Sequence, residues 1–229
     1  MKTSDKMKAE EGNYMRNVLV TGFGPFGGEP INPALEAIKL LGGRTVGGYR
    51  VVTREMPVTR FESIDAIVKH IQDTDPVLVL AVGQAGGRLE ITPERVAINM
   101  DDFRIPDNAG LQPVDEPVVP GAPAAYWSTL PIKMMVSAMR EAGIPASVSN
   151  SAGTFVCNHL FYGLMHYLDQ SGNKIRGGFV HIPYLPEQAA RVGAQPSMAV
   201  ETIVKGLEVA LGAALTSTAD IKQTGGTIC

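Results

Sequence analysis

The stretch Val77-Leu78-Val79-Leu80-Ala81-Val82 is an uninterrupted apolar run. A short run of this kind, rich in branched side chains, is typical of a central parallel strand that helices cover on both faces. Parallel strands need crossover connections, and these connections are usually helices. The run therefore predicts an α/β protein in which strands alternate with helices on both sides of this segment.

The rest of the chain shows this alternation. Short apolar stretches, which predict strands, are separated by longer stretches whose apolar residues recur at helical spacing. Strands are predicted at residues 18–20, 50–56, 77–82, 95–99, 146–150 and 178–182. Helices are predicted at residues 33–41, 59–71, 131–143, 158–168 and 197–215, the second beginning with a Thr59-x-x-Glu62 capping box. The order predicts a single three-layer α/β/α domain with a mostly parallel twisted sheet, whose site lies at the carboxyl ends of the strands.

Composition restricts the class of protein. The 229 residues are 45% hydrophobic and 19% charged, with a formal net charge of −3. These values fit a folded domain, and the mild acidity gives no electrostatic reason to expect nucleic acid. No apolar segment approaches the roughly 18 residues of a membrane-spanning helix. Two cysteines cannot form a disulfide framework, which favours a cytoplasmic location.

The two ends differ from the rest of the chain. Residues 1–14 alternate acids and bases and contain no apolar core, so we expect a disordered leader or an added segment and not a signal peptide. Residues 216–229 are polar and contain glycines, and we expect a flexible tail that ends in Cys229. The folded domain is predicted to span residues 15–215.

A glycine-rich loop follows the first predicted strand. Gly22-x-Gly24-x-x-Gly27 matches the dinucleotide-binding fingerprint, which requires a helix that opens at the loop. Here Asn32 is the predicted N-cap and Pro33 the first helical residue. Phe23 and Phe26 would crowd a pyrophosphate but would suit a flat apolar ligand. From these residues alone, a structural turn and a ligand-binding loop both remain open.

Cys157 is a candidate nucleophile. It follows a predicted strand and a turn of small residues, and it directly precedes a predicted helix. The dipole and free N–H groups of a helix N-terminus lower the pKa of a thiol and can bind an oxyanion. A lone cysteine is more often a buried, unreactive residue. The position nevertheless favours the reactive role.

A nucleophilic thiol needs a base and a group that orients the base. His181 lies near the end of a predicted strand and can reach the thiol if the two strands are neighbours. His159 follows Cys157 by two positions and would point to another side of the helix. Glu90 and Glu94 are both candidates for the orienting acid.

Residues 101–130 form a long irregular stretch with five prolines. A loop of this length inside a compact domain is typically functional, or covers a site or an interface. Its Asp101, Asp102 and Asp107 could suggest a metal site, but no histidine is near them in sequence. Loop capping is the expected role of these aspartates.

Five motifs, in order, resemble the pyroglutamyl peptidase I family of cysteine peptidases, also called pyrrolidone-carboxylate peptidases. They are TGFGPFGG (21–28), GQAGGRLEITPERVAIN (83–99), FRIPDNAG (103–110), SAGTFVCNHLF (151–161) and HIPYLPEQ (181–188). The similarity runs from about residue 15 to about residue 215. It therefore covers the whole of the predicted folded domain and assigns it as a pyroglutamyl peptidase catalytic domain.

The resemblance implies specific roles for residues of this chain. It implies a catalytic triad of Glu94, Cys157 and His181, with Glu94 and not Glu90 as the acid. Arg104 is a candidate second donor to the oxyanion. It further implies a phosphorylase/hydrolase-like α/β/α fold, no cofactor and no metal, and a homotetramer. The implied ring-binding residues are Phe23, Phe26, Gln84, Ile105, Phe155 and Val156.

The expected activity is hydrolysis of an N-terminal pyroglutamyl (5-oxoprolyl) residue from small peptides through a thioester acyl-enzyme. The expected partners are such peptides, with neither nucleic acid nor membrane. One alternative is a nucleotide- or nucleoside-binding α/β protein that uses the loop Gly22–Gly27. A second alternative is a non-catalytic interaction protein with the same fold.

Overall fold

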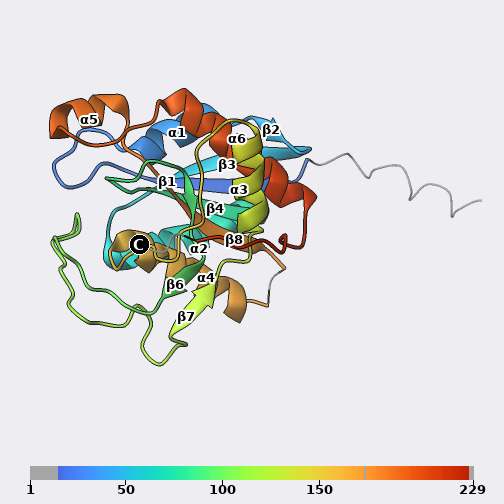
Figure 1. The fold of residues 1–229 in the computed structure, drawn as a ribbon. Coiled ribbons are helices and arrows are strands. Elements are labelled where there is room, and N and C mark those ends of the chain that lie inside the picture. Colours follow the sequence, from blue (N-terminus) through green and yellow to red (C-terminus); the bar gives the residue numbers. More distant parts are fainter. Residues whose placement is uncertain (1–14, 173, 227–229) are drawn as a thin grey trace, which may run out of the picture.

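A computed structural model describes residues 15–172 and 174–226. The predicted leader at 1–14 and Cys229 lie outside the described residues. The described chain forms three layers, with a mostly parallel sheet between two groups of helices (Figure 1). The fold class predicted from the sequence is confirmed.

The main sheet has the strand order β2-β3-β1-β4-β8-β5. Strands β1, β3, β4 and β8 run parallel, while β2 and β5 pair antiparallel at the two edges. A second, two-stranded antiparallel sheet joins β6 and β7. The strands are β1 (Asn17–Phe23), β2 (Thr45–Val46), β3 (Tyr49–Met56), β4 (Pro76–Gln84), β5 (Thr92–Pro93), β6 (Val96–Ile98), β7 (Ala125–Trp127) and β8 (Arg176–Ile182).

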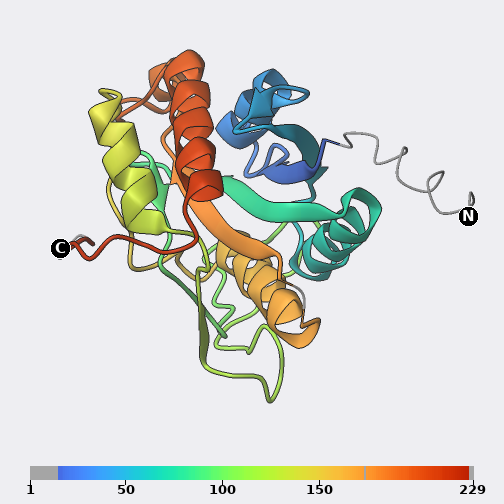
Figure 2. The same ribbon diagram turned by 90° about the vertical axis from the view of Figure 1, so that its right-hand side faces the viewer.

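Helices cover both faces of the sheet (Figure 2). Helices α1, α3 and α6 pack on one face, and α2 and α4 pack on the other. The short helix α5 follows β8. The helices are α1 (Pro33–Leu41), α2 (Arg60–Thr74), α3 (Ile132–Glu141), α4 (Val156–Gln170), α5 (Pro186–Val192) and α6 (Val200–Thr216).

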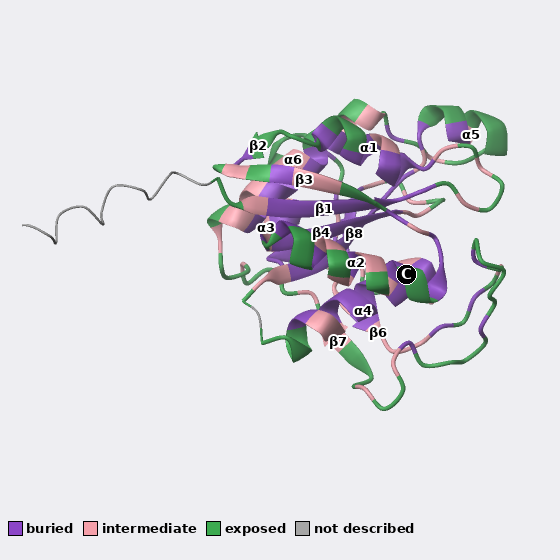
Figure 3. Cartoon of the chain, turned by 180° about the vertical axis from the view of Figure 1, so that it is seen from behind, coloured by how far each residue is buried: buried purple, intermediate pink, exposed green. Residues whose placement is uncertain are grey.

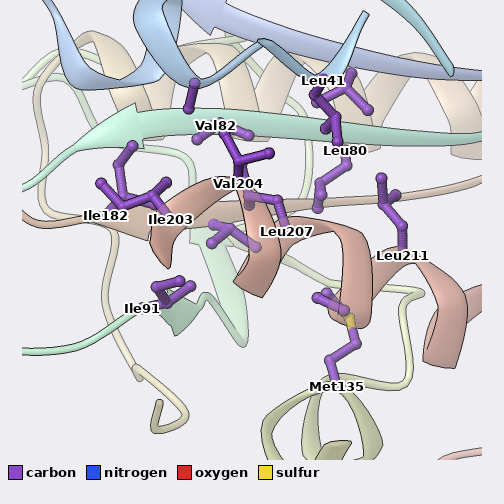
Figure 4. Close-up of a cluster of buried hydrophobic side chains, with 14 of the residues drawn as sticks. Leu41, Leu80, Val82, Ile91, Met135, Ile182, Ile203, Val204, Leu207 and Leu211 are labelled. Carbon is purple, nitrogen blue, oxygen red and sulfur yellow. The ribbon is translucent and has the colours of Figure 1, made fainter. Parts of the chain in front are cut away.

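The apolar run that predicted the fold forms the middle of β4. Leu80 and Val82 point into the core under α1, α3 and α6, where Leu207 of α6 packs (Figure 4). Val79 and Ala81 point into the opposite core, under α2 and α4. Both faces of the strand are therefore buried, as Figure 3 shows for the middle of the sheet. This two-sided burial explains why the run is apolar at every position.

Two differences from the predicted elements bear on the site. The segment at 146–150 does not form a continuous strand, but its backbone makes isolated parallel bridges, Ile91 with Ala146 and Glu94 with Ser149. Helix α4 begins at Val156, so Cys157 lies in its first turn and not before it. The short elements β2, β5, β7 and α5 were not predicted, because they are too short to show a period.

The start of α2 is capped differently from the prediction. The Thr59 hydroxyl donates to the Glu62 carboxylate at 3.1 Å and does not cap the helix. The Asp107 carboxylate accepts the Arg60 N–H at 2.7 Å instead. Its other oxygen accepts the N–H groups of Ala109 and Leu111, both at 2.9 Å. The loop-capping role predicted for Asp107 is therefore confirmed, with the added cap on α2.

Asp101 ties the long loop to two helices. Its buried carboxylate accepts the Arg60 Nε–H at 2.8 Å and bonds to His159 Nδ1 at 2.8 Å. The Asp102 carbonyl accepts the Thr154 hydroxyl at 2.8 Å, in the turn that precedes α4. The irregular stretch at 101–130 is thus held against the starts of α2 and α4.

The segment after α6, for which the sequence predicts flexibility, contacts the body of the domain. The Asp220 carboxylate accepts the N–H groups of Lys133 and Met134, at 3.1 and 2.9 Å, and so caps α3. The Gly225 carbonyl accepts a hydrogen bond from Arg95. Within the described part of the chain, no helix has both the length and the apolar character needed to cross a membrane.

Candidate active site

The carboxyl ends of β4 and β8 place Gly83 and His181 side by side. The two residues are direct partners in the parallel register of these strands. Paired residues of neighbouring strands point to the same face of a sheet, and residues two apart in one strand do the same. Phe179, two positions before His181, lies in the core under α4. His181 therefore also points to the α4 side.

Cys157 approaches this point from above the sheet. It lies in the first turn of α4, partly exposed, after the N-cap residue Phe155. A Cβ atom added to Gly83 would lie 2.9 Å from the Sγ atom of Cys157. The sulfur therefore sits directly against the bare backbone of β4, on the same face as His181.

Glu94 completes the cluster. It follows β5, whose Thr92 is the antiparallel partner of His181. Its fully buried carboxylate accepts a hydrogen bond through Oε1 from His181 Nδ1 at 2.7 Å. Glu90, the other candidate acid, lies in the hollow between α3 and the C-terminal segment. The structure thus brings Glu94, His181 and Cys157 together.

The pKa of Glu94 is lowered. Burial by itself would raise it, but the hydrogen bond with His181 and the nearby Arg88 guanidinium outweigh burial. Arg88 Nη1 lies 2.6 Å from the same Oε1 atom that His181 contacts. Glu94 is therefore a carboxylate at neutral pH.

The pKa values of the other two groups move in opposite directions. Burial lowers the pKa of His181, Arg88 acts in the same direction, and the Glu94 contact opposes both. Burial raises the pKa of the Cys157 thiol to about 12, with the charge of Glu94 adding and Arg88 opposing. The thiol pKa is thus raised, and not lowered as its position at the helix N-terminus predicted. The resting pair is a neutral imidazole beside a neutral thiol.

A small slot opens beside Cys157. It is mainly apolar and contains about 220 Å³ of space, part of which is open to solvent. Five of the six predicted ring-binding residues line it, all except Ile105. The lining residues are Phe23, Phe26, Asn32, Val58, Gln84, Phe155, Val156 and Cys157.

A wider cleft, open to solvent, shares Phe26, Gln84 and Phe155 with the slot. Ile105 lines this outer cleft, and so does the exposed Arg104. The two predicted residues thus lie beside the approach to the slot and not among the residues that line it.

Two residues of the slot, Asn32 and Val58, were not predicted to line it. Asn32 was identified only as the N-cap of α1, and it has that role, since its Oδ1 accepts the Ala34 N–H at 3.0 Å. Its Nδ2 also donates to the Gly24 carbonyl at 2.8 Å. The Asn-Pro pair after a glycine-rich loop was the available signal, but it indicates a cap as readily as a ligand contact.

The glycine-rich loop is part of this slot. Gly27 and Gly28 adopt positive φ angles of 62° and 80°, which favour glycine in a tight turn. Helix α1 begins only at Pro33, so its N-terminus does not open at the loop. Phe23 and Phe26 of this loop line the slot. The dinucleotide-binding alternative is not supported.

No metal site accompanies the cluster in the described residues, where no group of three or more His, Cys, Asp or Glu side chains could hold an ion. The metal hypothesis for the 101–107 aspartates is thus unsupported. His159, which is distant in sequence, does contact the Asp101 carboxylate. Arg60 donates a hydrogen bond to the same carboxylate, which leaves it paired with a cation of the protein itself.

Known proteins resemble this chain over nearly its whole length. A family model described as pyroglutamyl peptidase matches residues 16–217. The pyrrolidone-carboxylate peptidase of Cupriavidus necator is 59% identical over 213 residues, which cover 93% of this chain and 99% of the relative. That of Aliivibrio fischeri is 56% identical over 215 residues, 94% of this chain and 100% of the relative.

Solved structures give the same result. The pyroglutamyl peptidase I of Bacillus amyloliquefaciens has a TM-score of 0.90 at 48% identity, covering 92% of this chain and 100% of that one. The pyrrolidone carboxyl peptidase of Thermococcus litoralis has a TM-score of 0.88 at 36% identity, with the same coverage. A cysteine, a histidine and a buried glutamate beside a small apolar slot are therefore found in a chain that belongs to the pyroglutamyl peptidase family.

Proposed function

We propose that this protein removes an N-terminal pyroglutamyl residue from peptides as a cysteine peptidase, with Cys157 as nucleophile, His181 as base and acid, and Glu94 as the orienting carboxylate. The activity is that of its family. The observation that carries the residue assignment is the 2.7 Å hydrogen bond between Glu94 and His181, on the sheet face where the Cys157 sulfur lies. Glu94 selects the His181 tautomer that leaves Nε2 free to accept a proton.

The first step forms the thioester. The Cys157 Sγ atom attacks the pyroglutamyl carbonyl carbon, and its proton passes to His181, which becomes imidazolium. Because the thiol and imidazole are both neutral in the resting site, attack and proton transfer are coupled. Glu94 stabilises the cation that forms. His181 then gives this proton to the leaving amine, and the C–N bond breaks.

The second step releases pyroglutamate. Neutral His181 accepts a proton from water, whose oxygen attacks the thioester carbon, and Cys157 leaves and recovers a proton. In both steps a negative oxygen develops at the carbonyl. The N–H groups in the first turn of α4, including that of Cys157, are the proposed donors to it. Arg104 is the proposed second donor and would have to reach inward from the outer cleft.

The slot fits a lactam ring. A pyroglutamyl residue has no free α-amino group, so its site needs no carboxylate to bind an ammonium. The lining residues of the slot are apolar except for the two amides of Asn32 and Gln84 and the thiol of Cys157. Phenylalanines contact the flat ring, and the amides offer hydrogen bonds to its polar edge. The remainder of the peptide would lie in the outer cleft, near Ile105.

The test is turnover of a pyroglutamyl amide by the wild type and by Cys157→Ala. We expect release of the amine by the wild type and none above background by the variant. A trapped pyroglutamyl thioester on Cys157, detected by mass spectrometry after acid quench, would support the covalent step. Activity in Cys157→Ala would overturn the assignment. Failure of the wild type to turn over the amide would favour the non-catalytic alternative.

We also propose a homotetramer located in the cytoplasm, with no cofactor. Large apolar side chains, among them Leu89, Val114 and Trp127, are largely exposed on the single chain and are candidates for burial between subunits. Light scattering should give four times the chain mass, and a monomer would contradict the proposal.

Activity should be unaffected by a chelator. Removal of residues 1–14 should leave activity unchanged if the folded domain begins at residue 15.

A further inference from the structure

We propose that Arg88 is a positioning residue of this active site, which holds the Glu94 carboxylate in the orientation that His181 uses. The inference rests on the proposed roles of Glu94, Cys157 and His181. Neither the five motifs nor the triad assigned a role to Arg88, which lies in the loop between β4 and β5.

Arg88 shares one carboxylate oxygen with the catalytic histidine. Its Nη1 donates to Glu94 Oε1 at 2.6 Å, and His181 Nδ1 contacts the same atom at 2.7 Å. Nη1 also donates to the Thr92 hydroxyl, and Nη2 donates to the Ser151 carbonyl at 3.1 Å. The planar guanidinium therefore connects the acid, the strand beside His181 and the turn that leads into α4.

The carboxylate needs this partner because it is buried. Glu94 has no exposed surface, and a neutral imidazole donates a hydrogen bond to it but supplies no charge. A buried carboxylate without a paired cation is strongly disfavoured. Arg88 forms an ion pair with Glu94 that does not depend on the protonation state of His181. Arginine rather than lysine suits the place, since its rigid fork reaches several acceptors in one plane.

Arg88 acts from outside the substrate site. It lies in an open hollow with Gly87, Thr92, Ser149 and Ser151. None of the residues that line this hollow lines the slot or the outer cleft. Loss of Arg88 should therefore lower kcat and leave KM little changed.

The charge of Arg88 also acts on the reacting groups. It lowers the pKa of His181 and that of Cys157. When the charge is removed, both pKa values rise. Because His181 must be neutral to accept the thiol proton, the acid limb of the kcat/KM profile then moves to higher pH. A purely structural role would lower activity at every pH without moving this limb.

The experiment measures pH profiles of kcat and kcat/KM for the wild type, Arg88→Gln and Arg88→Lys. For Arg88→Gln we expect kcat about 10–100-fold lower, a size typical for loss of a residue that orients a functional side chain, with KM within about twofold. Its acid limb should move to higher pH, because the pKa of His181 rises when the Arg88 charge is lost. Arg88→Lys keeps the charge, so its acid limb should match the wild type while kcat recovers only in part.

Arg95→Gln is the matched control. Arg95 lies on the same segment but donates to Asn150 Oδ1 at 2.8 Å and to the Gly225 carbonyl. Arg95→Gln should have the kcat of the wild type, and the acid limb of its kcat/KM profile should lie at the wild-type pH. A second readout needs no substrate: at a fixed pH, alkylation of Cys157 by iodoacetamide should be slower in Arg88→Gln than in the wild type or in Arg95→Gln.

Several outcomes would overturn the inference. For Arg88→Gln they are a wild-type kcat, a large rise in KM, or a kcat/KM profile that is lower at every pH while its acid limb stays at the wild-type pH. Circular dichroism and thermal melts establish folding. If Arg88→Gln does not fold, Arg88→Met, which also removes the charge, takes its place: lower kcat at unchanged KM with a raised acid limb supports the inference, and wild-type kcat or an unmoved acid limb contradicts it. Activity retained by Cys157→Ala would instead show that the proposed triad is wrong.

Discussion

The Cys157 sulfur lies against Gly83, 2.9 Å from the position that a Cβ atom on this glycine would occupy. The same Cβ would be 2.7 Å from the ring of Phe179. Neither contact is compatible with a side chain, so the end of β4 must be bare backbone. Since Gly83 is also the register partner of His181, the glycine determines how close the thiol can come to the histidine.

Gly83→Ala should therefore abolish most activity while the domain still folds. The added methyl must displace either the sulfur or the phenylalanine ring, and a misplacement of about 1 Å costs on the order of 100-fold in rate. Overpacking should also reduce the free energy of unfolding by about 1–3 kcal/mol. Steady-state kinetics and denaturant titration measure the two effects.

Gly212→Ala is a suitable control for Gly83→Ala. Gly212 lies in α6, and its added Cβ would meet only Val46, at 3.9 Å. Activity should be unchanged and stability equal or higher, because alanine favours the helix by about 1 kcal/mol. Equal activity of Gly83→Ala and the wild type would contradict the close packing of Cys157 on the sheet.

The pH dependence follows from the lowered pKa of His181. The imidazole has to be neutral to accept the thiol proton, and its pKa lies below the ordinary value of about 6.5. Activity should thus be maintained as the pH falls to about 6.5, and the acid limb of kcat/KM should have its midpoint below that value. A midpoint above 6.5 would show that Glu94 outweighs burial.

Stability should fall in the same acid range. Because the folded state holds His181 with a lowered pKa, the unfolded chain binds more protons below about pH 6.5. The contribution of neutral His181 is fully present above that pH and is lost as the pH falls through its folded-state pKa. Denaturant titrations from about pH 7 to pH 5 should show this loss, and His181→Gln should reduce its slope.

The triad variants should have unequal costs. Cys157→Ala and His181→Ala should each abolish measurable turnover, since the two groups act as a unit. Glu94→Gln keeps the shape but loses the charge that stabilises imidazolium, and it should lower kcat by up to about 10⁴-fold. Glu90→Gln is the matched control and should be close to wild type. Loss of activity in Glu90→Gln, together with wild-type activity in Glu94→Gln, would contradict the assignment of Glu94 as the orienting acid.

The alkylation of Cys157 should reflect its protonated thiol. Burial raises its pKa to about 12, so the thiolate fraction, and with it the rate of iodoacetamide modification, should rise from about pH 7 to pH 10 without a plateau. Inactivation should follow modification of Cys157 and be independent of Cys229, as peptide mass spectrometry can determine. A plateau near neutral pH would indicate a thiolate–imidazolium pair instead.

Much of this arrangement could be predicted from local sequence. The all-apolar stretch in β4 and the Asn-Pro start of α1 each have one dominant structural explanation, and both predictions are confirmed. Residue patterns alone left Glu90 and Glu94 equally possible, because the choice depends on which strand neighbours His181. The raised thiol pKa could not be predicted either, since burial is a property of the packed fold and not of a helix N-terminus.

Arg88 illustrates the same limit. Nothing in the sequence distinguishes it from Arg95, since both are arginines that flank the same short strand. Only the fold places the Arg88 guanidinium on the Glu94 oxygen and directs Arg95 toward Asn150 and the C-terminal segment. Contacts between side chains of different segments are thus the part of the site that requires a structure.

Recognition of the lactam should appear as rejection of prolyl substrates. A prolyl residue replaces the ring carbonyl with CH₂, which leaves the groups that face that carbonyl without a partner, and it brings a charged amine into the slot. A site that hydrogen-bonds the missing group can discriminate by about 10⁴-fold or more, whereas an apolar slot alone gives on the order of ten- to a few hundredfold. The measurement is kcat/KM for pyroglutamyl and prolyl derivatives of one leaving group. Comparable values would mean that the slot does not recognise the lactam.

Phe26→Ala separates apolar contact from hydrogen bonding in this recognition. Phe26 lines the slot, and its ring centroid lies 6.0 Å from that of Phe155. Its loss should remove about 1–3 kcal/mol of apolar contact, which lowers kcat/KM for pyroglutamyl amides without creating prolyl activity, because the amides that face the ring remain. Phe61→Ala is the matched control, since Phe61 is mostly exposed on α2 and does not line the slot. Gain of prolyl turnover in Phe26→Ala alone would show that the phenylalanine, and not the polar edge of the slot, selects the substrate.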